Sequence, residues 1–599
     1  MLTRRDLIKM GLMGCGGYMV LRSGGRVGKV SAFFSDELRS PTLTPFMDRL
    51  PFPSECAELS SVNAFDDLAN YARDFVGAGT RYYGIKARER KVSFHKELKF
   101  TDVWGYLDNA RPDPADGGRL FAFCMPRIEV GQGSGAGIVI RHHNDPFNDL
   151  AVGRPFGVPT TTVHFHGGHQ PALADGFPDD VHNGPPGFDR VVFGGFDEFG
   201  RPNPNHYDYC HPLRDVGFSI DGKGTQDDRP SFLWFHDHIA DFTGSNAYRG
   251  LANICPVFDE FDTGRETDPA PAFGLPSGDF DIPLVLQDKI FDVDGALIFN
   301  PFEHDGFLGD TFVVNGLVQP FLEVKRRKYR FRFLNASNAR IYQFFLTNAT
   351  GQTFPMTQIA TEGGLLSTPW RGFDGQGIKS FMLAMAERVE VIVDFGDPRF
   401  ATQQEIFFEN RLAQSNGRKP DDLQNEGPKI VKFILRDRVE DPSRVPEVLR
   451  RRDALTQAML DRARVRTFKF DRSHGGWTIN GELVNLESPM AQVRLSTGLP
   501  GTAGFHPEIW HLENSSGGWW HPIHVHSEFM RVLRRNGQAP PPFESSVDGN
   551  ALKDTILLRG GENVDVFLDF RDFAGPFVFH CHNMEHEDMA MMARFDVIP

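Results

Sequence analysis

The chain has 599 residues, a formal net charge of −15 at pH 7, 40% hydrophobic residues and 24% charged residues. This length exceeds what one hydrophobic core supports, and the composition is that of a soluble globular protein with three or four domains. The negative charge excludes DNA and RNA as expected partners, because phosphate binding requires a basic surface.

The first 45 residues are expected to lie outside any folded domain. Thr3-Arg4-Arg5-Asp6-Leu7-Ile8-Lys9 resembles a twin-arginine (Tat) export signal, and the apolar stretch 10–21 is too short to span a bilayer. A charged surface helix is the alternative interpretation, and Cys15 is a candidate for lipidation. We therefore expect the Tat export machinery as a partner, a periplasmic or extracellular location and no stable membrane span.

Two histidine pairs stand in the first half of the chain. His164 and His166 lie in Thr-Val-His-Phe-His-Gly-Gly, and His236 and His238 lie in Trp-Phe-His-Asp-His. In an extended strand side chains alternate between faces, so each pair presents two imidazoles on one side. A single pair of this kind is more often structural than metal-binding, and only the combination of several pairs indicates a metal site.

Other histidines of this half match no motif. His142 and His143 are expected in a solvated loop, and so are His206 and His211, which lie in a stretch rich in Pro, Asn and Asp. His169 follows the first pair and is expected near the approach to any site there, without acting as a ligand.

The middle of the chain contains runs typical of β-strands. Residues 282–287 are apolar, and residues 390–395 are rich in β-branched side chains. Residues 328–334 alternate between polar and apolar side chains, as a half-buried strand does. Between Pro256 and Arg472 the only histidine is His304, so this region is expected to hold no metal cluster.

The C-terminal third contains the most informative motifs. His521, His524 and His526 stand in His-Pro-Ile-His-Val-His, and residues 564–570 and 577–579 predict strands leading into His580-Cys581-His582, followed by His586 and Met591. Two imidazoles, a thiolate and a weak thioether have the composition of a blue-copper site. Strand alternation directs Cys581 to one face and its two histidine neighbours to the other. One strand can thus contact two different metal centres, and eight imidazoles in four pairs suit a three-copper cluster.

These four motifs, in this order, resemble the multicopper oxidases. The chain is most similar to the branch that contains the bacterial spore-coat laccases and bilirubin oxidases. The resemblance implies an all-β fold with three cupredoxin-like Greek-key β-sandwich domains, at 46–262, 263–438 and 467–599. The second would be free of copper and hold the other two together. Residues 439–466 are expected to form a linker with one amphipathic helix.

The resemblance also implies four copper ions and their ligands. The type 1 copper would take His521, Cys581 and His586, with Met591 axial, and the type 2 copper would take His164 and His524. The type 3 pair would take the six remaining motif histidines, namely His166, His236, His238, His526, His580 and His582. Asp175 and Glu587 resemble acids that deliver protons near the cluster. For Glu587 the alternative is a partner that orients a ligand histidine.

The implied function is that of a laccase-like oxidase. It would couple one-electron oxidation of phenols, aromatic amines or bilirubin-type pigments to reduction of O₂ to water. A metallo-oxidase acting on Cu(I), Fe(II) or Mn(II) is the alternative, and a copper-free relative or copper carrier is a third candidate. The 16 methionines form no Met-rich insertion, which speaks against a cuprous oxidase.

Further residues leave alternatives open. Cys56, Cys124, Cys210 and Cys255 could form two disulfides in an oxidising compartment or remain as buried thiols. Trp519, two residues before His521, is similar to a tryptophan that modifies this ligand in bilirubin oxidases, and packing in the core is the alternative.

Overall fold

The structure is a computed structural model. It describes residues 39–59, 79–112, 137–144, 156–158, 160–179, 206–540 and 551–599, together with four two-residue strands, β1 (Arg22–Ser23), β2 (Arg26–Val27), β6 (Cys124–Met125) and β7 (Ile128–Glu129). The twin-arginine-like motif and Cys15 lie outside the described residues. No helix in the described part of the chain is long and apolar enough to cross a membrane.

The first sandwich contains two four-stranded sheets, ordered β10-β8-β4-β5 and β7-β12-β11-β9. Their aromatic core includes Trp104, Phe165 and Phe235. The strands other than β7 are β4 (Arg81–Val92), β5 (Thr101–Asp108), β8 (Ile138–Asn144), β9 (Val163–His166), β10 (His206–His211), β11 (Phe232–Asp237) and β12 (Ala252–Phe258), and the helices are α2 (Phe218–Asp221) and α3 (Thr243–Arg249).

The second sandwich has two larger sheets, one ordered β16-β15-β13-β18-β24-β21-β22 with β14 beside β13, the other β17-β26-β25-β19-β20 with β23 beside β19. Phenylalanines such as Phe331, Phe408 and Phe433, whose rings meet edge-to-face or tilted, fill the space between them. The strands are β13 (Asp281–Phe291), β14 (Leu297–Ile298), β15 (Thr311–Val314), β16 (Leu317–Val318), β17 (Phe321–Arg326), β18 (Lys328–Asn335), β19 (Tyr342–Thr347), β20 (Thr353–Phe354), β21 (Thr357–Thr361), β22 (Gly364–Trp370), β23 (Ser380–Leu383), β24 (Arg388–Asp394), β25 (Glu405–Asn410) and β26 (Lys429–Arg438).

The third sandwich has two five-stranded sheets, ordered β28-β27-β30-β34-β32 and β29-β36-β35-β31-β33. Trp510 and Phe579 lie in the core between them. The strands are β27 (Arg464–Ser473), β28 (Gly476–Ile479), β29 (Ala491–Arg494), β30 (Glu508–Asn514), β31 (His521–Val525), β32 (Arg531–Arg535), β33 (Thr555–Leu558), β34 (Asn563–Leu568), β35 (Gly575–Cys581) and β36 (Met592–Ile598), and helix α5 (Met584–Asp588) follows β35.

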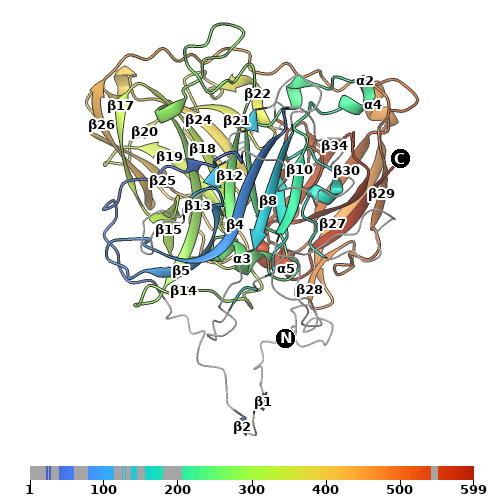
Figure 1. Cartoon of the computed structure of the whole chain (residues 1–599), viewed down its shortest axis with the longest axis horizontal. Coiled ribbons are helices and arrows are strands. Elements are labelled where there is room, and N and C mark those ends of the chain that lie inside the picture. The colour runs from blue at the N-terminus through green and yellow to red at the C-terminus, as the bar shows by residue number, and fades with distance from the viewer. Residues whose placement is uncertain are drawn as a thin grey trace.

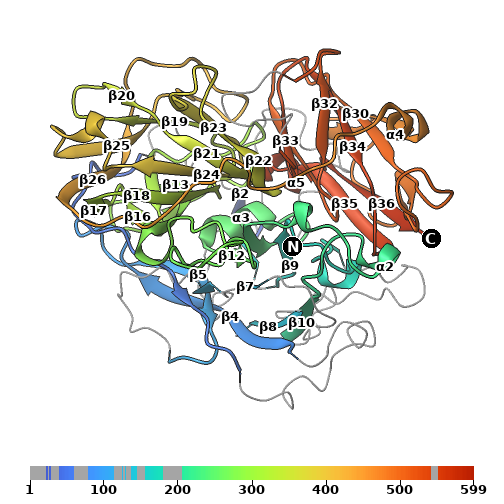
Figure 2. The ribbon, with the colours of Figure 1, turned by 90° about the horizontal axis from the view of Figure 1, so that it is seen from above.

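The predicted all-β fold of cupredoxin-like sandwiches is confirmed (Figure 1). Figure 2 shows the first sandwich, in blue and teal, lying below the second, in yellow-green, and the third, in orange and red. Helices α3 and α5 pack against each other where the sandwiches meet. Before β27 lies the short helix α4 (Gln457–Arg462), capped by the Thr456 hydroxyl, which accepts from the Met459 amide.

The predicted strands are present, but one prediction about burial is wrong. β18 was expected to be half-buried, yet seven of its eight residues are buried. Its polar positions face other buried groups: Arg330 Nη1 lies 2.7 Å from an Asp262 oxygen, and Arg332 Nη1 donates to the Ser231 carbonyl at 2.7 Å. The alternation is real, but the polar face is covered by the first sandwich, so ion pairs replace solvent there.

The expectation of loops around four histidines is also wrong. His142 and His143 lie in β8, and His206 and His211 lie in the neighbouring strand β10. His142 is buried, with its ring packed edge-on against Tyr209. Turn-forming residues nearby suggested a loop, whereas the pairing of β8 between β4 and β10 decides the structure.

Candidate metal centre

Two antiparallel strands of the third sandwich position the C-terminal motifs. In the pairing of β31 with β35, His524 lies opposite His580 and Ile523 lies opposite Cys581. Directly opposed residues share a face of the sheet, so the register separates the Cys581 thiol from the flanking imidazoles. His521 has the parity of Ile523 and falls on the Cys581 side.

The first cluster contains one thiol and two imidazoles. Cys581 Sγ lies 3.4 Å from His521 Nδ1 and 3.6 Å from His586 Nδ1, and these two nitrogens are 3.1 Å apart. The backbone amide of Asn583 donates to Cys581 Sγ at 3.4 Å. Met591 is fully buried in the same core and its carbonyl accepts from the Cys581 amide at 3.0 Å. A trigonal donor set thus forms around one point.

Burial sets the protonation of this cluster. It lowers the pKa of His521 to about 3 and that of His586 well below its usual range, so both rings are neutral and can act as ligands. Burial also raises the pKa of the Cys581 thiol, so a thiolate there requires a bound cation.

The second cluster collects the eight remaining motif histidines, none more than 1% exposed. His164 Nε2 lies 3.2 Å from His524 Nε2, His166 Nε2 lies 3.0 Å from His582 Nε2, and His238 Nε2 lies 3.2 Å from His580 Nε2. Ligand atoms within 4.8 Å of one another define several overlapping three-residue groups. Two of these groups, His166 with His236 and His582, and His238 with His526 and His580, have no residue in common. The first and third sandwiches contribute to both.

Second nitrogens fix the orientation of several of these rings. His164 Nδ1 donates to the Asp175 carbonyl at 2.6 Å, His236 Nδ1 to the Asp237 carbonyl at 2.7 Å and His524 Nδ1 to the Asp554 carbonyl at 2.8 Å. A ring that donates from Nδ1 presents its Nε2 lone pair to the cluster.

The residues present fit copper. Neutral imidazoles and a thiolate are the donors that copper sites use, and His521, Cys581 and His586 supply this set without a competing carboxylate among their ligand atoms. His236 Nε2 is buried and has no hydrogen-bond partner, an arrangement that a metal ion would satisfy. Protonation of these rings is opposed first by burial and then by the neighbouring imidazoles, which together lower the pKa of His166, His238 and His526 well below its usual range.

The two acids singled out in the sequence both lie at the second cluster. Asp175 Oδ2 lies 2.7 Å from His526 Nδ1, and its other oxygen accepts from Gln170 Nε2 at 2.9 Å. Glu587 Oε2 lies 3.2 Å from His580 Nδ1, and its Oε1 lies 3.6 Å from His238 Nε2. Both side chains are buried, and each carboxylate lies beside an imidazole of the second cluster.

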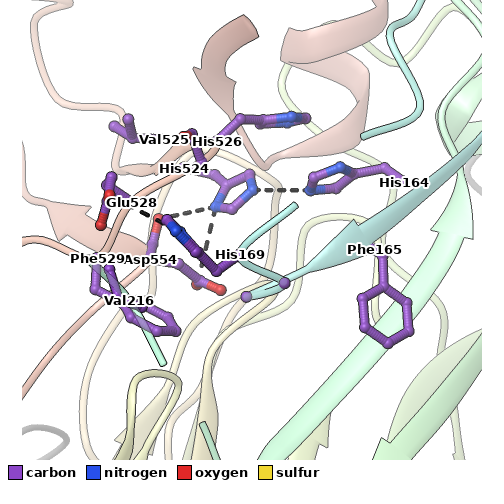
Figure 3. Close-up of a pocket in the computed structure, with 13 residues that line it drawn as sticks. His164, Phe165, His169, Val216, His524, Val525, His526, Glu528, Phe529 and Asp554 are labelled. Carbon is purple, nitrogen blue, oxygen red and sulfur yellow. Dashed lines mark hydrogen bonds and ion pairs between the residues drawn. The ribbon is translucent and has the colours of Figure 1, made fainter. Parts of the chain in front are cut away.

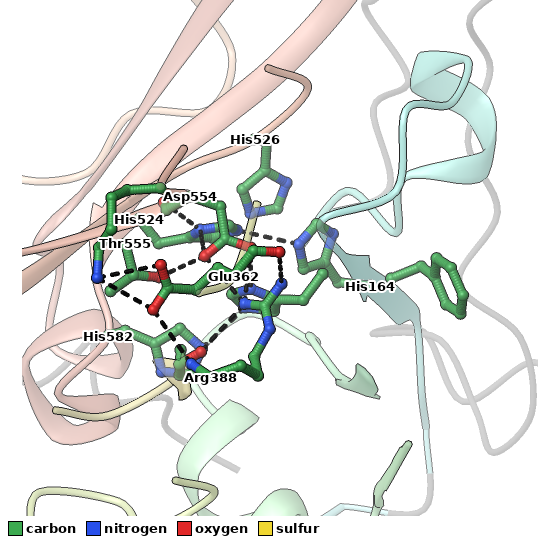
Figure 4. Close-up of polar contacts among 12 residues, drawn as sticks. His164, Glu362, Arg388, His524, His526, Asp554, Thr555 and His582 are labelled. Carbon is green, nitrogen blue, oxygen red and sulfur yellow. Dashed lines mark hydrogen bonds and ion pairs between the residues drawn. The ribbon is translucent and has the colours of Figure 1, made fainter. Parts of the chain in front are cut away.

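A buried charge network beside the cluster has no sequence motif. Arg388 Nη1 lies 2.7 Å from Asp554 Oδ2 (Figure 4). The same oxygen is 3.5 Å from His166 Nδ1. Lys553 Nζ contacts Glu362 and Glu387 at 3.1 and 2.8 Å. The adjacent Lys553 and Asp554 within the apolar run 551–558 were a detectable signal, because buried charges require partners.

The glycine after the first histidine pair allows this network to form. Gly167 has a φ of +76°, and a Cβ there would lie 2.6 Å from Arg388 Nη2. Any larger residue would therefore be strained and would displace the guanidinium.

A narrow pocket reaches the second cluster beside His164 and His524 (Figure 3). His169 lines it, with Nε2 2.7 Å from an Asp572 oxygen and Nδ1 3.8 Å from Glu528. Burial alone would lower the His169 pKa, but these two carboxylates raise it. The predicted place of His169 near the approach agrees with this position.

Trp519 is half-buried and its Nε1 donates to Asp305 Oδ1 at 3.0 Å. Cys210 and Cys255 are buried and form no disulfide, whereas Cys56 is disulfide-bonded. The side chain of Cys124 lies outside the described residues.

Comparison with known proteins identifies the family of this chain. The family model described as "Multicopper oxidase" matches residues 466–599. A bilirubin oxidase from Albifimbria verrucaria is 31% identical over 86% of this chain and 76% of its own, and a laccase from Haloferax volcanii is 32% identical over 93% and 86%. A crystal structure of a McoA multicopper oxidase variant from Aquifex aeolicus has a TM-score of 0.68 and 22% identity, covering 93% of this chain and all of that one. The predicted resemblance is confirmed, and the chain belongs to the multicopper oxidases, copper-dependent enzymes that use oxygen as the electron acceptor.

Proposed function

We propose that this protein is a laccase-like oxidase that takes single electrons from phenolic, aromatic amine or bilirubin-type donors and reduces O₂ to water with four of them. In this proposal His521, Cys581, His586 and Met591 would hold the type 1 copper. His164 and His524 hold the type 2 copper. The type 3 pair is held by two trios, His166 with His236 and His582, and His238 with His526 and His580.

The observation that carries this proposal is the continuous peptide through His580, Cys581 and His582. The thiol belongs to the first cluster and the two imidazoles to the second. His580 Nδ1 also donates to the Cys581 carbonyl at 3.2 Å, which adds a hydrogen-bonded path to the covalent one. Cys581 is bonded through the backbone directly to His580 and His582, and no other residues of the two clusters connect one cluster to the other by so few bonds.

Bound copper supplies the one-electron redox steps and the reduction of O₂. The protein chain positions the ligands, excludes water from the site and delivers protons to it. The eight cluster imidazoles are buried, so bulk water is kept from the site except through narrow openings. Asp175 contacts His526 Nδ1 at 2.7 Å, Glu587 lies 3.2 Å from His580 Nδ1, and we propose that both acids pass protons toward the cluster.

The other predictions remain part of the proposal. The second sandwich, at 263–438, acts as the copper-free brace between domains at 46–262 and 467–599, with 439–466 as linker. Export by the Tat machinery to the periplasm or beyond rests on the Arg4-Arg5 motif alone.

Steady-state O₂ uptake by copper-loaded protein tests the function. An aryl diamine, bilirubin, Cu(I), Fe(II) and Mn(II) are compared as donors by kcat/KM. We expect an organic donor to rank first. A preference for a metal ion by more than about tenfold, roughly 1.4 kcal/mol in transition-state free energy, would replace the laccase-like function by that of a metallo-oxidase.

A further inference from the structure

A cap from the second sandwich closes the type 1 site. His586 is fully buried, and its Nε2 donates to the backbone carbonyl of Asp305 at 3.2 Å. Asn583 Nδ2 donates to the same carbonyl at 3.2 Å. The cap consists of residues 304–306 and packs against the neighbouring segment 416–418. A Cβ on Gly417 would lie 2.2 Å from the Gly306 carbonyl oxygen, so there is no space between the two segments. A donor therefore cannot touch the imidazole and must deliver its electron through the cap.

Tryptophan and arginine side chains form the outer side of this cap. The rings of Trp477 and Trp519 meet edge-on with centroids 5.4 Å apart. The guanidinium carbon of Arg418 lies 4.8 Å from the Trp519 ring centroid, and that of Arg472 lies 5.3 Å from the same centroid and 5.3 Å from that of Trp477. Arg418 and Arg472 are both exposed, and Trp519 is half-buried.

The charge of this face is positive although the chain as a whole carries −15. Arg418, the exposed Lys419 beside it and Arg472 are cationic. The nearest acid of the cap, Asp305, is already engaged: its carboxylate receives Arg418 Nε at 2.8 Å and Trp519 Nε1 at 3.0 Å. Within the described residues Arg472 makes no ion pair, so its guanidinium remains available to a ligand.

We infer that this Arg-Trp face, defined by Arg418, Lys419, Arg472 and Trp519, docks aromatic donors that carry a carboxylate or another anionic group, and disfavours cationic donors and metal ions. The inference rests on the proposed function and specifies its substrate class. A guanidinium pairs with a carboxylate in a planar, bidentate manner, and an indole ring stacks on an aromatic donor. Each phenolic donor loses one electron to the protein and its phenolic proton to solvent, and four donors match one O₂ reduced with four protons to two waters.

Three donors with one phenol and different charges test this inference: syringate (anionic), methyl syringate (neutral) and the choline ester of syringic acid (cationic). Because the substituent also changes phenol reactivity, the quantity compared is the change in each kcat/KM between wild type and variant. In Arg472→Gln we expect kcat/KM for syringate to fall about fivefold more than kcat/KM for methyl syringate. We expect kcat/KM for the choline ester to rise relative to kcat/KM for methyl syringate. The control is Arg438→Gln, which removes the same charge from an exposed position on β26 and should leave the ratios unchanged.

The dependence of kcat/KM on ionic strength provides an independent test of this inference. If the positive face steers the donor, added salt lowers kcat/KM for syringate, whereas steering by the net charge of −15 would make salt raise it. A readout without turnover comes from 3,4,5-trimethoxybenzoate, which lacks the oxidisable hydroxyl. Its NMR line broadening by the oxidised holoenzyme should weaken in Arg472→Gln and persist in Arg438→Gln.

The outcomes separate the two levels of the proposal. A salt-induced rise for syringate, or equal losses for all three donors in Arg472→Gln, would overturn the docking face while leaving the oxidase intact. Failure of every organic donor to be oxidised by copper-loaded wild type would instead remove the proposed function itself.

Discussion

Arg388 and Asp554 join all three sandwiches beside the second histidine cluster. Arg388 belongs to β24 of the second sandwich, its Nε donates to the Phe232 carbonyl of the first at 3.1 Å, and its Nη1 lies 2.7 Å from Asp554 Oδ2 of the third. Asp554 in turn accepts from His524 Nδ1 through its carbonyl. A residue without metal-binding capacity thus fixes the relative positions of histidines that come from two other sandwiches.

We expect Arg388→Met to lose copper from the site of His164 and His524 and to destabilise the protein by about 3–5 kcal/mol, because it leaves the buried Asp554 carboxylate without its partner. Copper stoichiometry, the type 2 electron paramagnetic resonance signal and thermal unfolding measure this. Arg371→Gln breaks the more exposed pair with Glu447 and should change unfolding by less than about 1 kcal/mol. Full copper content with an unchanged type 2 signal in Arg388→Met would limit Arg388 to a role in stability.

Asp175→Asn should separate proton delivery from ring orientation. Asparagine keeps the shape and an oxygen that can accept from His526 Nδ1, so copper should be retained. We expect oxidation of the reduced enzyme by O₂ to slow by roughly a hundredfold or more, since general acid catalysis contributes factors of that size. Anaerobic reduction of the type 1 copper should proceed at the wild-type rate. Stopped-flow measurement of both half-reactions decides, and loss of copper in Asp175→Asn would show that the acid chiefly orients the ring.

Local alternation along single strands could be predicted from the sequence. The separation of Cys581 from His580 and His582 depends only on the two-residue period of one strand, so the structure agrees with the expected faces. The same holds for alternate apolar residues of β13, β24 and β34, such as Leu284, Val391 and Val566, which are buried in the core of their own sandwich. These features need no knowledge of another domain.

Features that depend on contacts between sandwiches could not be predicted. The burial of Arg330 on β18 is decided by Asp262, which belongs to a distant part of the chain. The division of six histidines into two trios requires the docking of the first sandwich on the third. The role of Arg388 depends on Asp554, 166 residues away, and neither lies in a motif.

Cys581→Ser tests the separation of the two clusters directly. The hydroxyl is a poor copper ligand and His580 and His582 are unchanged, so we expect loss of the type 1 visible absorption and of turnover, with copper retained at the histidine cluster. Absorption spectra, copper analysis and far-ultraviolet circular dichroism measure the three effects. A variant that keeps its colour would place the type 1 copper elsewhere, and one that loses all copper would contradict the independence of the two sites.

A buried lysine that belongs to neither cluster predicts the pH dependence of stability. Burial lowers the pKa of Lys289 to about 7, and its Nζ donates to the Tyr248 carbonyl at 2.6 Å. An unfolded lysine titrates near about 10.4, so between these values the unfolded chain binds more protons and the free energy of unfolding rises with pH. The destabilisation is complete below about pH 7 and disappears as pH approaches the unfolded value. From pH 7 to about 9.5 the lysine contributes a rise of roughly 3 kcal/mol in the free energy of unfolding, which Lys289→Met should remove.

Denaturant midpoints of wild type and Lys289→Met at both pH values measure the difference, with the exposed Lys419→Met as the control. Equal pH slopes for wild type and Lys289→Met would mean that the ammonium group keeps an ordinary pKa in the folded protein.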